Sequence, residues 1–114
     1  MHEISLVQAM LQQLSDLAAQ NQATKVIKIT MEIGQMSGVV ADSFRFGFEV
    51  LSGNDDLVRG AELVIITPPV TYRCTQCSHS EIAAARPDCC PQCREVFLIP
   101  EGGDDLILQQ VEME

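Results

Sequence analysis

The stretch CTQCSHSEIAAARPDCCPQC, residues 74–93, decides how this chain folds. It contains two C-x-x-C pairs, Cys74 with Cys77 and Cys90 with Cys93, separated by twelve residues. Each pair turns tightly and aims two sulfurs at one point, so two pairs on facing hairpins make a tetrahedral four-sulfur site with Zn–S bonds of about 2.3 Å. Protein fills all four positions and leaves no place for a catalytic water. The pattern therefore predicts one structural Zn(II) ion per chain, with iron in a rubredoxin-like site as the main alternative.

Two further side chains near these pairs can bind a metal. Cys89 precedes Cys90, and the Cys-Pro-x-Cys spacing selects Cys90 and Cys93 and leaves Cys89 as a free thiol. Exchange of Cys89 with Cys90 is the alternative. His79 lies two residues after the first pair, and we expect it to face solvent or to support the site from outside. Under altered metal or pH conditions it could replace a thiolate.

The cysteines occupy an insertion. Residues 70–100 hold all five of them, between Pro68-Pro69 on one side and Gly102-Gly103 on the other. A segment of this size cannot bury enough apolar surface to fold alone, so it needs a cross-link, and the bound metal provides one. We therefore predict a core domain formed by residues 1–69 and 101–114, and an inserted zinc ribbon formed by residues 70–100.

Apolar side chains recur with helical spacing in two segments of the core. Residues 4–20 place them at steps of three and four, which predicts a helix that faces the core. A second helix is expected to run to about Ser52, with Asp42 or Ser43 as its cap and Gly53 at its end.

Three further segments of the core show strand patterns. Residues 25–33 alternate between apolar and polar, as a half-buried strand does. Residues 61–67 form a nearly continuous apolar run, which predicts a central strand covered on both faces. Residues 106–113 return to a strand pattern. The predicted fold class is therefore α+β, with a small three-stranded sheet, two helices and the inserted four-cysteine zinc ribbon.

Composition narrows the possible partners. The 114 residues carry a formal net charge of −9, which disfavours nucleic acid and favours a metal cation or a basic patch on another protein. No apolar run approaches the roughly 18 residues that a membrane span needs. The opening Met-His-Glu has no basic or apolar signal region, so we expect a soluble, cytoplasmic protein without a membrane partner.

The N-terminus offers a second set of metal donors. The Met1 α-amine, the His2 amide nitrogen and the His2 imidazole can close fused chelate rings on one ion, and the Glu3 amide nitrogen completes a plane of four nitrogens. Ni(II) and Cu(II) favour such a plane, whereas Zn(II) prefers a tetrahedron. A histidine at position 2 is often incidental, and Glu3 also suits the first turn of a helix. The residues alone leave both interpretations open.

The whole chain resembles the HypA/HybF family of hydrogenase nickel-incorporation proteins. The resemblance rests on Met1-His2-Glu3, on Glu32-Ile33-Gly34, on Phe44 to Phe48, on Gly60 and Leu63, on the paired cysteines and on the ending Val111-Glu112. It implies that Met1, His2 and Glu3 bind Ni(II) as transferable cargo and that Cys74, Cys77, Cys90 and Cys93 hold Zn(II). It also implies delivery to a [NiFe]-hydrogenase large-subunit precursor together with the GTPase HypB. Some relatives carry an acidic residue near the position of Val40, where the nearest carboxylate here belongs to Asp42.

These observations favour a binding and transfer protein over an enzyme, because no nucleophile–base motif or phosphate-binding glycine loop occurs. The alternative is a zinc-ribbon module for protein interaction, in which His2 is incidental. The long apolar helix and the separable ribbon allow a monomer or a weak homodimer.

Overall fold

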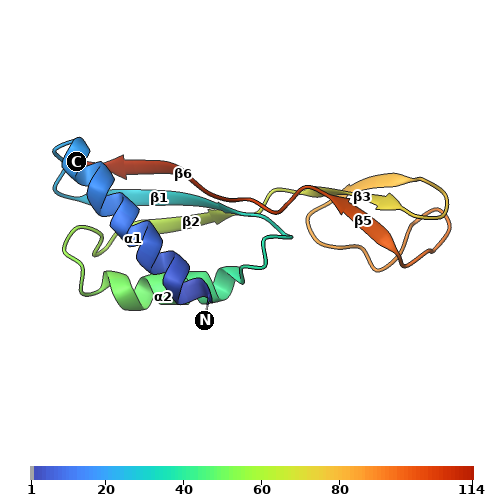
Figure 1. The fold of residues 1–114 in the computed structure, drawn as a ribbon, viewed down its shortest axis with the longest axis horizontal. Coiled ribbons are helices and arrows are strands. Elements are labelled where there is room, and N and C mark those ends of the chain that lie inside the picture. The colour runs from blue at the N-terminus through green and yellow to red at the C-terminus, as the bar shows by residue number, and fades with distance from the viewer. Residues whose placement is uncertain (1) are drawn as a thin grey trace.

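The chain folds into two lobes joined end to end. The computed structural model describes residues 2–114, with side chains from Glu3 onward, and measures 55 × 25 × 17 Å. The elements are α1 (His2–Gln20), β1 (Val26–Ile33), α2 (Ala41–Ser52), β2 (Glu62–Ile66), β3 (Val70–Cys74), β4 (Ser80–Ala83), β5 (Leu98–Glu101) and β6 (Leu106–Met113). We call residues 2–66 and 106–114 the helical lobe and residues 70–101 the cysteine lobe; they form the left and right halves of Figure 1.

The helical lobe is built on a sheet with strand order β2-β1-β6. β1 is parallel to β2 and antiparallel to β6, and Ile29 lies between Leu63 and Val111 in the register. Side chains of the sheet and of α1 and α2 form one hydrophobic core. Its buried members are Val7, Met10, Leu14, Val26, Ile29, Met31, Ile33, Phe44, Phe48, Val58 and Leu63.

α1 contributes one apolar stripe to this core, as its spacing predicts. Val7, Met10, Leu14 and Ala18 are buried, while the glutamines between them face solvent. Within residues 2–114, neither helix combines the length and the hydropathy that a membrane crossing requires.

The cysteine lobe has its own sheet, with strand order β4-β3-β5 and antiparallel pairing throughout. Its small core consists of Val70, Tyr72, Cys74, Cys90 and Leu98. Two of these five side chains are cysteines, so the metal-ligating residues are part of the packing. The architecture confirms the predicted α+β class, with a three-stranded sheet, two helices and a four-cysteine segment. The predicted domain boundaries, at 69/70 and 100/101, remain a prediction about independent folding.

The prediction that residues 61–67 form a central strand is wrong. β2 lies at the edge of its sheet, and β1 takes the central position because both other strands pair with it. Leu63 is buried, but Ile66 is 39% exposed. A short apolar run does not by itself distinguish a covered strand from an edge strand whose outer face carries isolated apolar side chains.

The prediction that Asp42 or Ser43 caps the second helix is also wrong. α2 begins at Ala41, its cap position is occupied by Val40, and the Val40 side chain makes no capping hydrogen bond. Instead, the Val40 N–H donates to Oε2 of Glu3 at 3.2 Å. A carboxylate at the start of α1 therefore serves the start of α2, where negative charge is favourable.

Two glycines allow the segment after β1 to pack closely against the segment before β6 where the lobes meet. The Gly34 N–H donates to the Asp105 carbonyl at 2.8 Å, and the Met36 N–H donates to the Gly103 carbonyl at 2.6 Å. A Cβ at Gly34 would overlap the Gly103 carbonyl group. Gly103 itself has φ +81°, and a Cβ there would lie 2.6 Å from Cγ2 of Val70. The joint therefore depends on close packing against backbone at Gly34 and against the Val70 side chain at Gly103.

We expect Gly34→Ala to lower the free energy of unfolding by about 1–3 kcal/mol, because the added methyl group must push two hydrogen-bonded segments apart. Urea unfolding of the metal-loaded protein measures this. Gly53→Ala is the matched control, since Gly53 has an ordinary φ of −60° and its nearest neighbours would lie 3.8 Å from the new methyl group. Equal losses in both variants, or none in Gly34→Ala, would contradict the close packing.

Candidate metal centre

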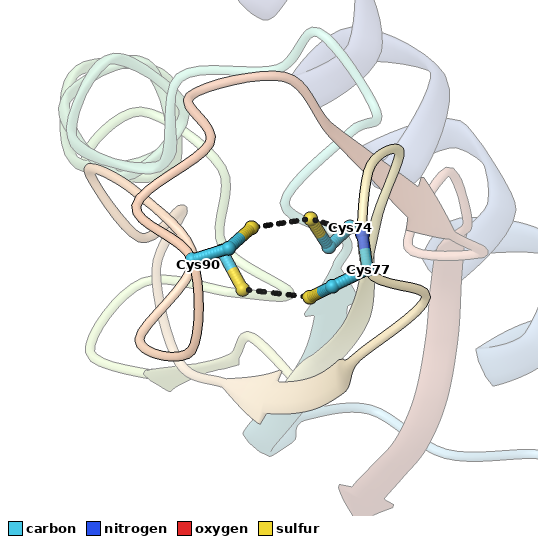
Figure 2. A group of neighbouring side chains, drawn as sticks. Cys74, Cys77 and Cys90 are labelled. Carbon is cyan, nitrogen blue, oxygen red and sulfur yellow. Dashed lines mark hydrogen bonds between the residues drawn. The ribbon is translucent and has the colours of Figure 1, made fainter.

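Four cysteine side chains converge at the far end of the cysteine lobe. The Sγ atoms of Cys74, Cys77, Cys90 and Cys93 all lie within 4.8 Å of one another. Figure 2 shows Cys74, Cys77 and Cys90 turned toward one another from opposite sides of the site. Cys74 lies 3.5 Å from Cys93, and Cys77 lies 3.6 Å from Cys90, measured between sulfurs. A tetrahedral Zn(II) with bonds of about 2.3 Å needs sulfurs about 3.8 Å apart, so this donor set fits the ion.

The two C-x-x-C pairs have the same backbone geometry. The Cys74 N–H donates to the His79 carbonyl and the Cys90 N–H donates to the Glu95 carbonyl, each at 2.8 Å. The N–H groups of Gln76 and Gln92 donate to the sulfurs of Cys74 and Cys90, at 3.3 and 3.4 Å. Each pair is thus a self-contained turn that closes five residues after its first cysteine. These amide donors stabilise thiolate, which is the form of cysteine that binds metals.

The residue after each pair adopts a left-handed backbone. Ser78 has φ 62° and Arg94 has φ 66°, in equivalent positions of the two turns. A residue with a Cβ loses about 1–2 kcal/mol in this conformation, whereas glycine adopts it readily.

We expect Arg94→Gly to raise the free energy of unfolding of the metal-loaded protein by about 1 kcal/mol, because the strain at position 94 disappears. Thermal unfolding measures the change. Arg94→Ala is the control, since it removes the same side chain but keeps the Cβ. If Arg94→Gly is no more stable than Arg94→Ala, the strain is absent.

The sulfurs differ in how readily they lose a proton. Amide hydrogen bonds from Cys77 and Gln76, helped by the neighbouring thiols, lower the pKa of Cys74 to about 6 against the opposing effect of desolvation. At Cys93 an amide hydrogen bond from Glu95 also lowers the pKa. There, desolvation and the three neighbouring sulfurs outweigh this hydrogen bond and raise the pKa of Cys93 to about 12. Four sulfurs this close cannot all be thiolates without a cation, which is a property of a metal site.

The structure separates Cys89 and His79 from the centre. Neither belongs to the converging group found in residues 2–114. Cys89 is half-buried and has a free thiol, while Cys90 is fully buried among the core side chains. The His79 imidazole lies 3.7 Å from the Glu81 carboxylate. In this conformation its backbone carbonyl supports the first turn, and its ring takes no part in the cluster.

The predicted nickel donors are only partly described. Met1 and the His2 side chain lie outside the described residues, and the backbone of His2 begins α1. The Glu3 carboxylate accepts the Val40 N–H, so its side chain ties α1 to α2. A shallow cavity of about 420 Å³ beside it is lined by Glu3, Ile4, Asp42, Ser43 and Phe46. Sequence reasoning missed the contact with Val40, because an apolar residue carries no signal for a cap supplied by another helix.

Fold and site together define a small metal-binding protein, with a closed four-sulfur centre on one lobe and an acidic N-terminal helix start on the other. The family model for hydrogenase/urease nickel incorporation, the metallochaperone HypA, matches residues 1–113. The chain belongs to this HypA family of nickel-incorporation metallochaperones.

Named relatives agree with this assignment over nearly their full length. The chain is 33% identical to the hydrogenase maturation factor HypA of Shewanella oneidensis, covering 100% of this chain and 96% of that protein. It is 35% identical to the factor of the same name from Albidiferax ferrireducens, covering 100% of both. Among solved structures, that of the Ni metallochaperone HypA from Helicobacter pylori superposes with a TM-score of 0.66 and 28% identity, covering 99% of this chain and 97% of that one.

Proposed function

We propose that this chain binds Ni(II) at its N-terminus and delivers it to a [NiFe]-hydrogenase large-subunit precursor. The Met1 amine, the amide and imidazole nitrogens of His2 and the Glu3 amide nitrogen are the donors. The observation that carries the proposal is the start of α1 at His2, together with the family match from residue 1. The first N–H groups of a helix have no i−4 carbonyl within it, so ligation through the His2 amide breaks no helical hydrogen bond.

The cysteine centre has a different role in this proposal. Cys74, Cys77, Cys90 and Cys93 hold one structural Zn(II), which supplies the folding free energy that a five-residue core cannot. The sulfur spacing suits a tetrahedral ion, and four protein ligands leave no open coordination position. The chain then acts by binding and transfer and is not itself an enzyme.

The charge distribution supports a partner at the helical lobe. In residues 70–100 three arginines balance three carboxylates, so the formal net charge of −9 belongs to the rest of the chain. We propose that the GTPase HypB docks there, with His2 and Glu3 near the contact, and that a cytoplasmic monomer or weak homodimer is the working form. Complementary charge accelerates such encounters and makes them sensitive to salt.

The test is equilibrium dialysis of nickel against the wild-type protein and His2→Ala, at pH 7.5 and at pH 5.5. We expect His2→Ala to lose the site, and the wild-type affinity to fall at pH 5.5, because protons compete for imidazole, amine and amide nitrogens. Zinc content is the control and should not differ between the two proteins at pH 7.5. Equal nickel binding by both would leave His2 incidental and favour a zinc-ribbon interaction module instead.

A further inference from the structure

One side chain makes three hydrogen bonds at the joint between the lobes. Gln35 lies two residues after the end of β1, and its Nε2 donates to the Ala83 carbonyl at 3.0 Å and to the Pro68 carbonyl at 3.2 Å. Its Oε1 accepts a hydrogen bond from the Tyr72 hydroxyl at 2.5 Å. Two of these three partners, Tyr72 and Ala83, belong to the cysteine lobe, and the third lies in the connection that leads into it.

Tyr72, one of the partners of Gln35, is itself held firmly in place. Tyr72 is 2% exposed, at the centre of the small core around β3. The Arg86 guanidinium lies 5.7 Å from the centre of the Tyr72 ring, and it also donates to the Leu98 carbonyl at 2.8 Å. The position of the Tyr72 hydroxyl is therefore fixed. An amide side chain can accept a hydrogen bond from a hydroxyl and donate to two carbonyls at the same time.

The covalent connections alone do not fix the angle between the lobes. One runs through Pro68 and Pro69, and the other through Gly102 and Gly103, both of which have positive φ. The Met36 N–H holds the Gly103 carbonyl, but Gly102 has open space around it and gives the chain freedom to pivot there. The hydrogen bonds of Gln35 join the loop after β1 to Tyr72 and Ala83 of the cysteine lobe, so they oppose the pivot.

We propose that Gln35 is a positioning residue that fixes the orientation of the cysteine lobe on the helical lobe. Through it the four-sulfur centre and the N-terminal helix are presented to a partner as one rigid surface. The loop of Gln35 continues to Val40, whose N–H is bound by Glu3, so the same segment contacts the joint and the start of α1. This inference does not depend on where nickel binds.

The experiment compares backbone residual dipolar couplings and ¹⁵N relaxation of the zinc-loaded, nickel-free protein with those of Gln35→Ala. In the wild type we expect one alignment tensor and one rotational correlation time to fit both lobes. In Gln35→Ala we expect two tensors, with smaller couplings in the cysteine lobe, because the two hydrogen bonds from Gln35 to that lobe and the one to its connection are lost. If one tensor still fits both lobes of Gln35→Ala, the proposal is overturned.

Two more variants separate orientation from stability. Gln109→Ala removes a glutamine whose Nε2 donates to Glu32 at 2.9 Å, a contact between β6 and β1 within the helical lobe, and should keep the single tensor. Tyr72→Phe keeps the ring in the core and removes the hydroxyl, so it should loosen the joint while the lobe stays folded with zinc bound. If Gln35→Ala lowers the melting temperature without separating the tensors, Gln35 stabilises only its own loop and the proposal fails. Separation of the tensors in Gln109→Ala would overturn it equally.

Discussion

Cys74→Ala and Cys93→Ala are each expected to release the metal and unfold the cysteine lobe, while the helical lobe stays folded. The cysteine lobe has five buried core residues, two of them ligands, so the metal provides most of its stability. Structural zinc sites contribute about 10–16 kcal/mol to folding at neutral pH, more than such a core can replace. Metal analysis after gel filtration and ¹H–¹⁵N spectra of both lobes measure the two effects.

Cys89→Ser is the matched control for this experiment, because it removes a neighbouring thiol that lies outside the sulfur cluster. It should keep one zinc per chain and a folded lobe. Metal loss in Cys89→Ser, or full zinc retention in Cys74→Ala and Cys93→Ala, would contradict the assignment.

Zinc affinity should also fall steeply with decreasing pH. The pKa of Cys93 is about 12 without metal, so binding must displace its proton, and added protons reverse the reaction.

Adding Gly-Ser before Met1 is expected to abolish the native nickel site, although every side chain remains in place. The extension converts the Met1 amine into an amide and moves the free amine two residues away, so the original chelate rings cannot close. Wild-type Ni(II) in a plane of four nitrogens should be diamagnetic with a weak yellow d–d band. Nickel titrations followed by absorption compare the wild type, the extended protein and His2→Ala.

The helical lobe and the zinc site should be unchanged in both variants, because the cysteines lie in the other lobe. Zinc content and the far-ultraviolet circular dichroism spectrum are the controls. An extended protein with wild-type affinity and an unchanged spectrum would refute ligation by the amine. Nickel would then be bound by His2 together with other side chains, and the cavity beside Glu3 and Asp42 would be the place to look for them.

The sequence predicts local features of this chain well. Spacing selects Cys90 over Cys89, and the structure brings Cys90 into the sulfur cluster. The stripe of residues 4–20 and the alternation of residues 25–33 correspond closely to α1 and β1. In both cases the signal and the structure arise from residues that are neighbours in sequence.

Features that depend on distant partners could not be predicted in the same way. β2 is an edge strand because β2 and β6 both pair with β1. The apolar run of β2 gives no sign of this pairing. The cap of α2 comes from Glu3, 37 residues earlier. Nothing in the sequence around Gln35 indicates a role, because its partners Tyr72 and Ala83 come near it only in the folded chain. The donors at Met1 and His2 remain a prediction from chemistry and family resemblance.

The matching turns around the cysteines have a consequence for the order of assembly. Each turn closes within six residues by its own backbone hydrogen bonds, and only twelve residues separate the two pairs. Closing so short a loop costs little entropy and takes well under a microsecond in a flexible chain. Either C-x-x-C turn can therefore bind the ion first, and the second turn can bind to it afterwards. We expect the cysteine lobe to form rapidly once metal is present, even on a chain whose long-range β1–β6 pairing is not yet made.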